Sequence, residues 1–424
     1  MRKIIAGRRA GTGEEFGFNI NTGIPGESGI GFFRIPISSQ TSTGMTAVLV
    51  DWGDGSAMTY INSANYATAT LHDYGASGIY SVKIFGGINS FSFRWMVPVN
   101  SGINDQDKLV EIVKWGSMRI RDEGAFEGCS NLEKVLCTDL PNFIPAFSSG
   151  ESGTRLFQDC SSLVLINRIS DWDTSKVLKM NSMFRGCTKL EGGNLIGGGI
   201  NIGAWDVSNV TTMEVMFASA TLFNGKMFNV GSTTTNLTAM FSLAITFNNS
   251  GTFSIESWDT SNVITMNSMF QGAIAFNRNI STWNTSSVEK MELMFANYNN
   301  NLMIFNQPIG AWNTAAVKNM NGIFYRNDVF DQDISNWNVD NWDTANNNFG
   351  ISNLSSYPGG AADLNLSQAN YDALLIAWDN YAFSSWPGGN VDFGESKYTA
   401  GGTAAAARAA LVTKWGSITD GGPI

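Results

Sequence analysis

The fold is decided by a stretch in the middle of the chain, Trp258-Asp259-Thr260-Ser261-Asn262-Val263-Ile264-Thr265-Met266-Asn267-Ser268-Met269-Phe270. Six tryptophans precede a phenylalanine by twelve residues, as Trp258 precedes Phe270. These pairs are Trp172–Phe184, Trp205–Phe217, Trp258–Phe270, Trp283–Phe295, Trp312–Phe324 and Trp337–Phe349. Weaker copies without the tryptophan surround Phe126, Phe157 and Phe241. Self-similarity at a short period is typical of repeat architectures, so the sequence predicts nine copies of a unit of about 25 residues.

Apolar residues between the tryptophan and the phenylalanine also recur. Val263, Met266 and Met269 stand seven, four and one residues before Phe270, and the first five pairs keep this pattern with Ile323 as one replacement. This spacing fits one side of a helix. Each unit is therefore predicted to hold a short strand near its Ile-Ser-x-Trp position, a polar turn and one or two helical turns. Neighbouring units must cover the apolar side of each unit, and insertions such as residues 299–303 are predicted to be loops.

Composition excludes several classes of function. The 424 residues carry a net charge of −10, which argues against binding to a nucleic-acid backbone, because that requires a basic surface. His72 is the only histidine, which argues against histidine-ligated zinc and Ser-His-Asp catalysis. The cysteines are Cys129, Cys137, Cys160 and Cys187. Three of them stand three residues after a repeat phenylalanine, where later copies have alanine, so buried free thiols are predicted. No metal site and no cofactor is predicted.

Short alternating segments precede the repeats. They include Val48-Leu49-Val50-Asp51-Trp52-Gly53-Asp54-Gly55-Ser56, His72-Asp73-Tyr74 and Gly78-Ile79-Tyr80-Ser81-Val82-Lys83-Ile84. Together they resemble the polycystic-kidney-disease (PKD) type of immunoglobulin-like sandwich, which implies a spacer or adhesion module. Gly53 and Gly55 allow a tight turn in which Asp51 and Asp54 accept backbone N–H bonds. A calcium role for these two aspartates is the alternative.

The repeat itself, with Phe276-Asn277-Arg278-Asn279-Ile280-Ser281 following the quoted stretch, resembles the BspA-like leucine-rich repeat of bacterial surface proteins. The resemblance implies a right-handed solenoid with short parallel strands and no catalytic activity. The expected fold is mainly β with short helices. The predicted parts are an N-terminal arm over residues 1–40, a PKD-like β-sandwich over 41–100, a solenoid over 101–358 and an α/β C-terminal cap over 359–424.

The C-terminal cap is predicted from a change of pattern. Ser367 is a candidate N-cap of a helix whose apolar side carries Tyr371, Leu374, Leu375 and Trp378. An alanine-rich second helix is predicted over residues 403–415, followed by a closing strand. Such a segment covers the open end of the last repeat.

Candidate binding residues lie in the polar turn that follows each tryptophan. They are Asp173, Ser175, Asp206, Ser208, Asp259, Ser261, Asn284 and Ser286. Hydrogen-bonding groups beside aromatic rings suit glycans or protein surfaces. The alternative is that these side chains only satisfy the turns between coils. No catalytic residue is predicted, because no pair of carboxylates lies in a recognisable acid–base pattern.

These features predict a non-enzymatic structural or binding protein. Arg2, Lys3, Arg8 and Arg9 lack the apolar stretch of a signal peptide, and no window of about 18 apolar residues predicts membrane insertion. A location on the surface of a phage virion agrees both with the resemblance to surface proteins and with these expectations. The protein would then be a head or tail appendage that contacts the host surface or glycans. The arm would dock onto other virion proteins. The alternative is a bacterial cell-surface adhesin that binds proteins or glycans, and homo-oligomerisation is left open.

Overall fold

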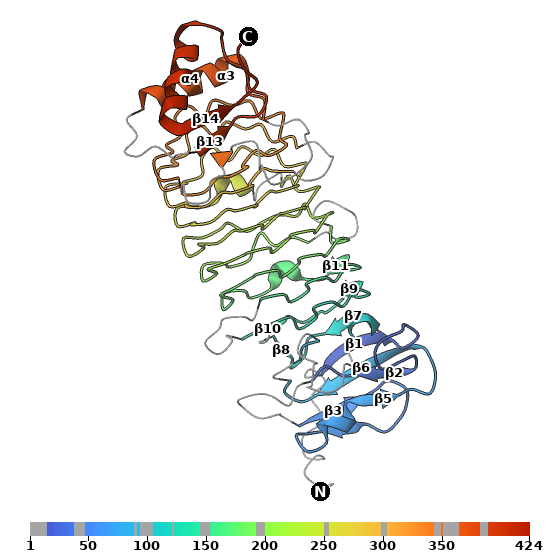
Figure 1. Cartoon of the computed structure of the whole chain (residues 1–424). Coiled ribbons are helices and arrows are strands. Elements are labelled where there is room, and N and C mark those ends of the chain that lie inside the picture. The colour runs from blue at the N-terminus through green and yellow to red at the C-terminus, as the bar shows by residue number, and fades with distance from the viewer. Residues whose placement is uncertain are drawn as a thin grey trace. The chain divides into compact units, whose positions relative to one another are not determined.

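The computed structural model describes residues 15–37, 47–88, 91–93, 105–120, 123–144, 153–191, 200–249, 254–297, 303–342, 349–350, 364–381 and 389–424. Over these residues the chain is mainly β-structure with a few short helices (Figure 1), as the sequence predicts. The chain forms two compact units, Met1–Asn209 and Val210–Ile424, and each is described by itself. The limits predicted at residues 40, 100 and 358 do not coincide with this division, which falls inside the repeats.

The N-terminal unit is built on a sheet of seven strands in the order β11-β9-β7-β1-β6-β3-β4. The strands are β1 (Phe16–Asn21), β3 (Val48–Asp51), β4 (Thr59–Ile61), β6 (Ile79–Phe85), β7 (Leu109–Lys114), β9 (Lys134–Val135) and β11 (Leu165–Ile166). A second pair joins β2 (Phe32–Arg34) and β5 (Leu71–Asp73). Short elements complete the unit: α2 (Tyr66–Ala69), β8 (Arg119–Ile120), β10 (Asn142–Phe143) and the 3₁₀ turns Gln106–Lys108 and Ile169–Asp171.

The strands predicted from the PKD-like segments are confirmed as β3, β5 and β6. The predicted arm over residues 1–40 is wrong for β1 and β2. In β1, Phe16, Phe18 and Ile20 are fully buried, and the strand pairs antiparallel with both β6 and β7. A strand with two neighbours and a buried apolar face is part of the core and cannot act as an arm. Residues 1–14 lie outside the described residues.

β7 joins the antiparallel sheet to the repeats. It pairs antiparallel with β1 on one side and parallel with β9 on the other, and β9 pairs parallel with β11. The first repeat is also covered from the N-terminal side, because the backbone N–H of Phe93 donates to the carbonyl of Ala125 at 3.2 Å. The ring of Phe91 lies 5.7 Å from that of Phe126. The predicted sandwich therefore does not end at residue 100, since its sheet continues through the first coils.

A fully buried ion pair holds one loop of this unit in place. The Lys108 ammonium lies 3.2 Å from the Asp105 carboxylate and donates to the carbonyls of Gly29 and Phe32 at 2.6 and 2.7 Å. It also donates to the Ser28 hydroxyl at 2.7 Å. A buried charge is tolerated when its hydrogen-bonding capacity is filled in this way. The pair therefore fixes residues 28–32 against the start of β7.

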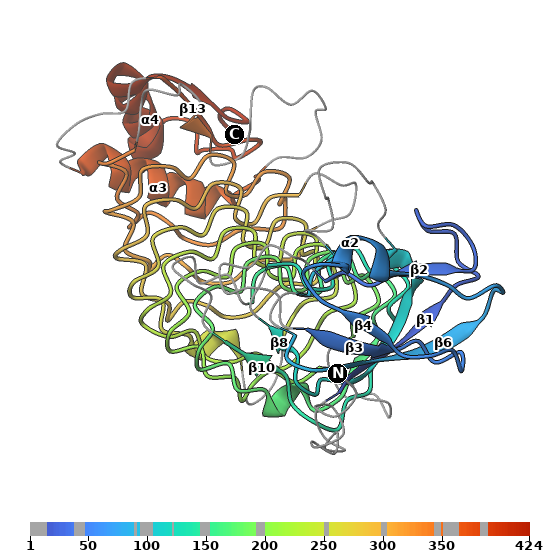
Figure 2. The ribbon, with the colours of Figure 1, turned by 90° about the horizontal axis from the view of Figure 1, so that it is seen from below.

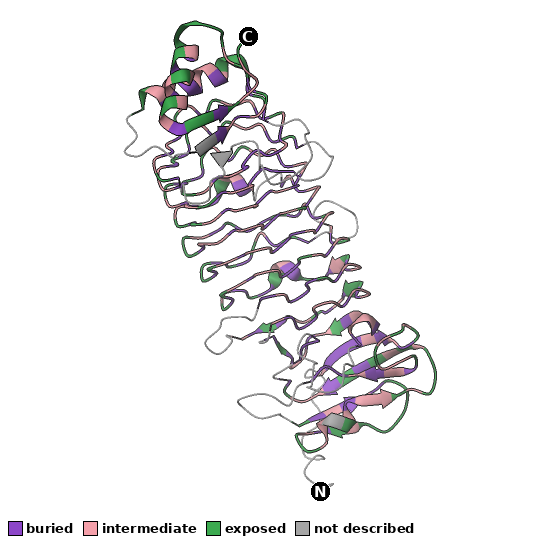
Figure 3. Ribbon diagram, in the orientation of Figure 1, coloured by how far each residue is buried: buried purple, intermediate pink, exposed green. Residues whose placement is uncertain are grey.

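In the C-terminal unit each copy of the repeat forms one coil, and successive coils lie over one another (Figure 2). Phenylalanine rings at equivalent positions stack from coil to coil. In the first column the centroid distances are 5.8 Å for Phe217–Phe241, 5.7 Å for Phe241–Phe270, 5.9 Å for Phe270–Phe295 and 6.0 Å for Phe295–Phe324. A tryptophan column runs parallel to it through Trp258, Trp283, Trp312 and Trp337. The rings of both columns are buried and form the core of the coils. Along the ribbon of these coils, buried residues alternate with partly exposed ones (Figure 3).

A second phenylalanine in each coil packs face to face with the first. Phe270 and Phe276 are 3.7 Å apart, and Phe295 and Phe305 are 3.8 Å apart. Phe305 follows its partner by ten residues, where Phe276 follows by six, yet it stacks on Phe276 at 5.7 Å. The longer spacing between Phe295 and Phe305 thus leaves the register of the core unchanged. The insertion predicted at residues 299–303 lies outside the described residues except for Met303.

The predicted helical turns are wrong. Residues two before the repeat phenylalanine have a left-handed backbone conformation, with φ of 54° at Ser268 and 57° at Leu293. This conformation interrupts an α-helix, and it turns alternate N–H groups toward the next coil. Ser268 N–H donates to the Glu292 carbonyl at 2.7 Å, and Phe270 N–H donates to the Met294 carbonyl at 3.0 Å. The Met-x-x-Met-Phe spacing therefore reflects short turns that bury every apolar side chain of the motif.

The predicted strand near each tryptophan is also misplaced. The N–H of Trp283 donates to the Ile280 carbonyl at 3.1 Å, which closes a turn. Parallel bridges form one residue before the first position of the methionine column. They join Thr212, Asn236, Thr265, Lys290 and Asn319 in sequence. Each of these five coils thus contributes one bridge residue to a parallel ladder, and turn-to-turn hydrogen bonds join the coils elsewhere along the backbone. One 3₁₀ turn, Ile255–Ser257, lies in these coils.

The two helices and the closing strand predicted for the C-terminal region are confirmed. Helix α3 (Gln368–Asn380) begins after Ser367, whose hydroxyl accepts the N–H of Asn370 at 3.4 Å. The four predicted apolar residues of α3 are buried. Helix α4 (Gly402–Trp415) runs into β14 (Gly416–Thr419), which pairs parallel with β13 (Gly389–Asp392). The third strand of this sheet is β12 (Phe349–Gly350), so the residue twelve after Trp337 belongs to the cap sheet.

Trp342 replaces the repeat valine in the last described coil. Its N–H donates to Val339 at 3.3 Å, as the N–H of Val263 donates to Thr260 at 3.0 Å. Its ring meets that of Trp378 on α3 edge-on, with centroids 6.2 Å apart. The larger side chain therefore extends the core from the coils into the cap, which explains a tryptophan at a position where the repeat has valine.

The stacked rings make a specific prediction for stability. Phe270 is fully buried against Phe241, Phe276, Phe295 and Trp283. We expect Phe270→Ala to lower the free energy of unfolding by about 3–5 kcal/mol, because it removes a ring from four contacts and leaves a cavity. Urea denaturation measures this. The control is Ile264→Ala, since Ile264 is 44% exposed and its truncation should cost far less. Equal losses for the two variants would contradict the stacked core.

Candidate functional site

The predicted binding residues all lie in one kind of turn. The Oδ1 atoms of Asp206 and Asp259 accept the N–H groups of Ser208 and Ser261 at 2.9 and 3.1 Å. Asn284 accepts the N–H of Ser286 in the same way at 3.1 Å. Asp173 accepts both the N–H and the hydroxyl of Ser175, at 3.2 and 2.5 Å. The aspartate or asparagine at the start of each turn is exposed, and one of its oxygens is committed to the turn.

The residues around these turns bond from coil to coil. The buried Thr260 hydroxyl donates to the Asn284 carbonyl at 3.0 Å, and Thr285 donates to Asn313 at 2.9 Å. The indole N–H of Trp283 donates to the Ile255 carbonyl of the preceding coil at 2.8 Å. The conspicuous Trp-Asp-Thr-Ser motif therefore supplies hydrogen bonds within and between coils. This geometry favours the alternative that the polar residues satisfy the turns.

The electrostatics of these turns agree with that interpretation. The side-chain and backbone hydrogen bonds of Ser208 lower the pKa of Asp206, and those of Ser261 lower the pKa of Asp259. The same bonds from Ser175 lower the pKa of Asp173. Hydrogen bonds to a carboxylate favour its charged form, so each aspartate is held ionised by its own turn.

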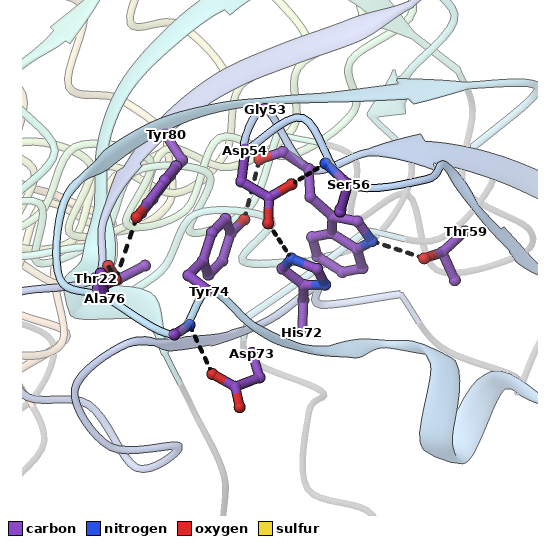
Figure 4. A network of polar contacts seen from close by, with 12 residues as sticks. Thr22, Gly53, Asp54, Ser56, Thr59, His72, Asp73, Tyr74, Ala76 and Tyr80 are labelled. Atoms are coloured by element: carbon purple, nitrogen blue, oxygen red, sulfur yellow. Dashed lines mark hydrogen bonds and ion pairs between the residues drawn. The ribbon is translucent and has the colours of Figure 1, made fainter.

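A polar and aromatic cluster surrounds the only histidine (Figure 4). His72 Nε2 lies 2.7 Å from Asp54 Oδ2, and its ring stacks on Trp52 with centroids 4.5 Å apart. Tyr74 meets His72 edge-on and donates to the carbonyl of Trp52 at 3.2 Å. The Trp52 indole N–H donates to the Thr59 hydroxyl at 2.8 Å. The cluster ties the loop after β3 to β4 and β5, so His72 is held as a structural residue of the sheet.

The two aspartates of this loop accept backbone N–H bonds, as predicted. Asp51 Oδ1 accepts from Gly53 at 3.0 Å, and Asp54 Oδ1 accepts from Ser56 at 2.9 Å. Gly53 requires its glycine because φ is 79° and a Cβ would lie 2.3 Å from the carbonyl oxygen of Ser81. Both oxygens of Asp54 are thus engaged by protein groups, Oδ1 by Ser56 and Oδ2 by His72. A calcium role for Asp51 and Asp54 stays an untested alternative.

The four cysteines are free and buried, as predicted for the three of the repeat. Burial raises the pKa of the thiols of Cys137, Cys160 and Cys187. The Cys160 thiol donates to the Phe126 carbonyl and the Cys187 thiol to the Phe157 carbonyl, both at 3.1 Å and both in the preceding coil. Thiols in such surroundings are poor nucleophiles and metal ligands, because both roles require the thiolate.

A row of asparagine side chains was missed by the sequence analysis. Each member follows the second phenylalanine of its coil, and its Oδ1 accepts the N–H of the equivalent residue in the next coil. The bonds are Asn248 to Asn224 at 2.9 Å, Asn277 to Asn248 at 3.0 Å, Asn306 to Asn277 at 3.0 Å and Asp331 to Asn306 at 3.0 Å. The recurring Phe-Asn dipeptide was the signal that could have revealed it.

Asp331 ends this row and hydrogen-bonds to the start of the cap. Its Oδ1 accepts the N–H of Ser367 and the side-chain amide of Asn370, both at 2.8 Å. The Asn370 amide also donates to the Asp331 carbonyl at 3.1 Å. An acidic side chain at the first turn of α3 is favourable to the helix dipole. The row therefore links the coils of the C-terminal unit to the start of the cap.

Metal-type clusters and membrane-spanning helices are both absent from the described residues. Within them, no three or more His, Cys, Asp or Glu side chains lie together as a metal site would require. No described helix has both the length and the apolar character needed to cross a membrane.

Comparison with known proteins gives one family. The model of a family described as "Mycoplasma protein of unknown function, DUF285" matches residues 151–252, 195–297 and 249–357 in three overlapping passes. The chain is therefore similar to this family over its repeats. The search of curated proteins and the search of solved structures gave no match.

The cluster around His72 predicts a pH dependence for the N-terminal unit. Burial acts to raise the pKa of Asp54, but the hydrogen bonds of Ser56 and His72 outweigh it and lower this pKa from 3.8 to about 2. A depressed folded-state pKa contributes stability that is present above the unfolded value and lost as the pH falls through the folded value. We expect Asp54→Asn to remove this contribution. The melting temperatures of the two proteins should differ at pH 5 and converge between pH 4 and pH 2. A constant difference over that range would contradict the assignment.

Proposed function

We propose that this protein is a non-enzymatic display protein, with a PKD-like sandwich at the N-terminal end of a BspA-like, right-handed leucine-rich-repeat solenoid. The proposal rests on one observation. The repeated polar side chains are used to join coil to coil, as Thr260, Trp283 and Asn277 do, so repetition builds a scaffold. A stack whose repeated residues hold its own coils together serves as a spacer that can present a surface.

The sheet organisation supports a rigid attachment between the proposed sandwich and the first coils. β7 belongs to both, through antiparallel bonds to β1 and parallel bonds to β9. A shared strand leaves no flexible linker at this point, so a force on the first coils is carried directly into the sheet. This arrangement suits a module whose task is to hold a projecting part in a fixed orientation.

We propose the surface of a phage virion as the place where the protein works, as a head or tail appendage. The support is chemical: the first thirteen residues contain Arg2, Lys3, Arg8 and Arg9 and no acidic residue, in a chain of net charge −10. Such a segment is complementary to an acidic partner and would act as the docking arm. Because β1 begins at Phe16, the proposed arm is restricted to residues 1–14.

A bacterial cell-surface adhesin is the second candidate. The description of the matching family, which names Mycoplasma, favours this location. Both proposals give the protein a non-enzymatic binding role, and they differ in whether a virion or a bacterial cell displays it.

The proposed solenoid predicts the effect of removing one coil. Deletion of residues 258–282 should leave a folded protein, because Trp283 and Phe295 can then stack on Phe228 and Phe241 of the preceding coil. Deletion of residues 258–270 should unfold the C-terminal unit, since it leaves half a coil with an uncovered core. Circular dichroism with urea titration compares the two. Similar loss of structure in both would refute the solenoid.

The proposed location is tested on isolated particles. We expect antibody against the C-terminal cap to label purified phage particles in electron micrographs, and removal of residues 1–14 to abolish this labelling while the free protein keeps its fold. The control replaces the four basic residues by glutamine at full length. Labelling of bacterial envelopes and not of particles would favour the adhesin, and full occupancy by the truncated protein would refute the arm.

A further inference from the structure

Two columns of side chains run side by side along the C-terminal unit. Each coil contains a three-residue segment whose central phenylalanine is buried, while the residues before and after it reach the surface. The first column is Leu222, Thr246, Ala275, Ile304 and Val329, and the second is Asn224, Asn248, Asn277, Asn306 and Asp331. Because alternate residues of an extended segment point to opposite sides, the two columns share one face. We call these ten residues the Phe-Asn strip.

The asparagines of the strip have fixed orientations. In Asn224, Asn248, Asn277 and Asn306 the Oδ1 atom accepts a backbone N–H, so the amide cannot be reversed without losing that bond. Gln307 adds a second donor to Asn277 Oδ1 at 2.9 Å. Among the described residues, none accepts a hydrogen bond from the Nδ2 groups of these four asparagines. Four side-chain amides, one per coil, therefore carry N–H donors at a partly exposed surface.

The neighbouring column is apolar and exposed. Leu222, Ile304 and Val329 are 41%, 46% and 38% exposed, and Ala275 lies between the first two. Only Thr246 adds a hydroxyl to this column. A row of hydrogen-bond donors thus runs beside a row of apolar side chains, and in the first four coils neither row carries a charge.

The strip repeats at a nearly constant interval. The buried rings beneath it lie 6.0 Å apart for Phe223–Phe247, 6.1 Å for Phe247–Phe276 and 5.7 Å for Phe276–Phe305. One donor and one apolar contact are therefore offered at each step of the stack, so a ligand that is itself a regular linear chain can meet several of them.

We propose that the Phe-Asn strip binds a linear, uncharged polysaccharide. Sugar rings combine apolar C–H faces with hydroxyl and acetal oxygens, so the apolar column packs against the faces while the amides donate to the oxygens. The net charge of −10 and the carboxylate of Asp331 disfavour nucleic acid and acidic polysaccharides. The inference rests on the proposed display function, to which it adds a ligand and a site distinct from the Trp-Asp turns.

The decisive variant removes the donors and keeps the scaffold. In the double variant Asn248→Asp and Asn277→Asp, each Oδ1 still accepts its backbone N–H, whereas the amide donor becomes an acceptor. Asp331 shows that an aspartate fits this column. The full-length protein is run in native gels containing hydroxyethyl cellulose, galactomannan or dextran, with alginate as the acidic probe. We expect at least one neutral polysaccharide to retard the wild type, and the double variant to bind it at least tenfold more weakly at an unchanged melting temperature.

The matched control is Asn284→Asp with Asn313→Asp. It makes the same change of charge in the same stack, at exposed turn positions where Asp259 stands naturally. We expect this variant to bind like the wild type. Loss of binding in the control and not in the strip variant would assign the ligand to the Trp-Asp turns and overturn the inference.

Two other outcomes would also overturn the inference. Retardation by alginate alone would do so, as would the absence of retardation in all three neutral gels. Neither result tests the proposed display function, which is tested separately by the labelling of particles. If sedimentation shows that the wild type is a dimer and that Ile304→Ser separates it, the strip is a self-association surface and the inference fails.

Discussion

The coils depend on one kind of hydrogen bond, from alternate backbone N–H groups of a coil to the carbonyls of the next. In the C-terminal unit these bonds run from Val215, Phe217 and Ser219 onward through every described coil up to Asn297. They require a left-handed residue two positions before each repeat phenylalanine. Those residues are Gly124, Arg155, Ser182, Val215, Ala239, Ser268, Leu293 and Gly322. The stacked rings and the polar rows can form only because this backbone keeps equivalent residues above one another.

The sequence shows clearly which residues repeat, but it shows the backbone conformation of the repeat much less clearly. The columns of tryptophan, methionine and phenylalanine and the small residue at Cys160 could be predicted from spacing alone, because each recurring position is a buried one. The helical turns were wrongly predicted because a valine or leucine with positive φ has no signal in its residue type. Val215 and Leu293 adopt this conformation only because the neighbouring coils supply acceptors for the N–H groups that it exposes.

The N-terminal boundary and the candidate site are further features that the sequence alone could not predict. β1 reads Phe-Gly-Phe-Asn-Ile-Asn and alternates well, yet its pairing partners in β6 and β7 lie 58 or more residues away, so the pairing could not be predicted from the local pattern. The Trp-Asp turns are conspicuous in the sequence, but one oxygen of each aspartate or asparagine that starts them is committed to the turn. The asparagines after Phe223, Phe247 and Phe276 were hidden because asparagine is common in loops. Only the fixed orientation of their amides distinguishes them.

The direction of the backbone bonds differs between two segments of each coil. Around the left-handed residue the N–H groups point toward the C-terminal side, as from Ser268 to the Glu292 carbonyl, whereas in the parallel ladder they point toward the N-terminal side, as from Glu289 to the Ile264 carbonyl. The two faces of a coil therefore differ in chemistry. The first coil presents carbonyls, which is why donors from Ser92 and Phe93 close it. An internal coil fits a copy of itself on either side, so such a protein can lengthen by duplicating its interior, whereas its two ends can never be exchanged.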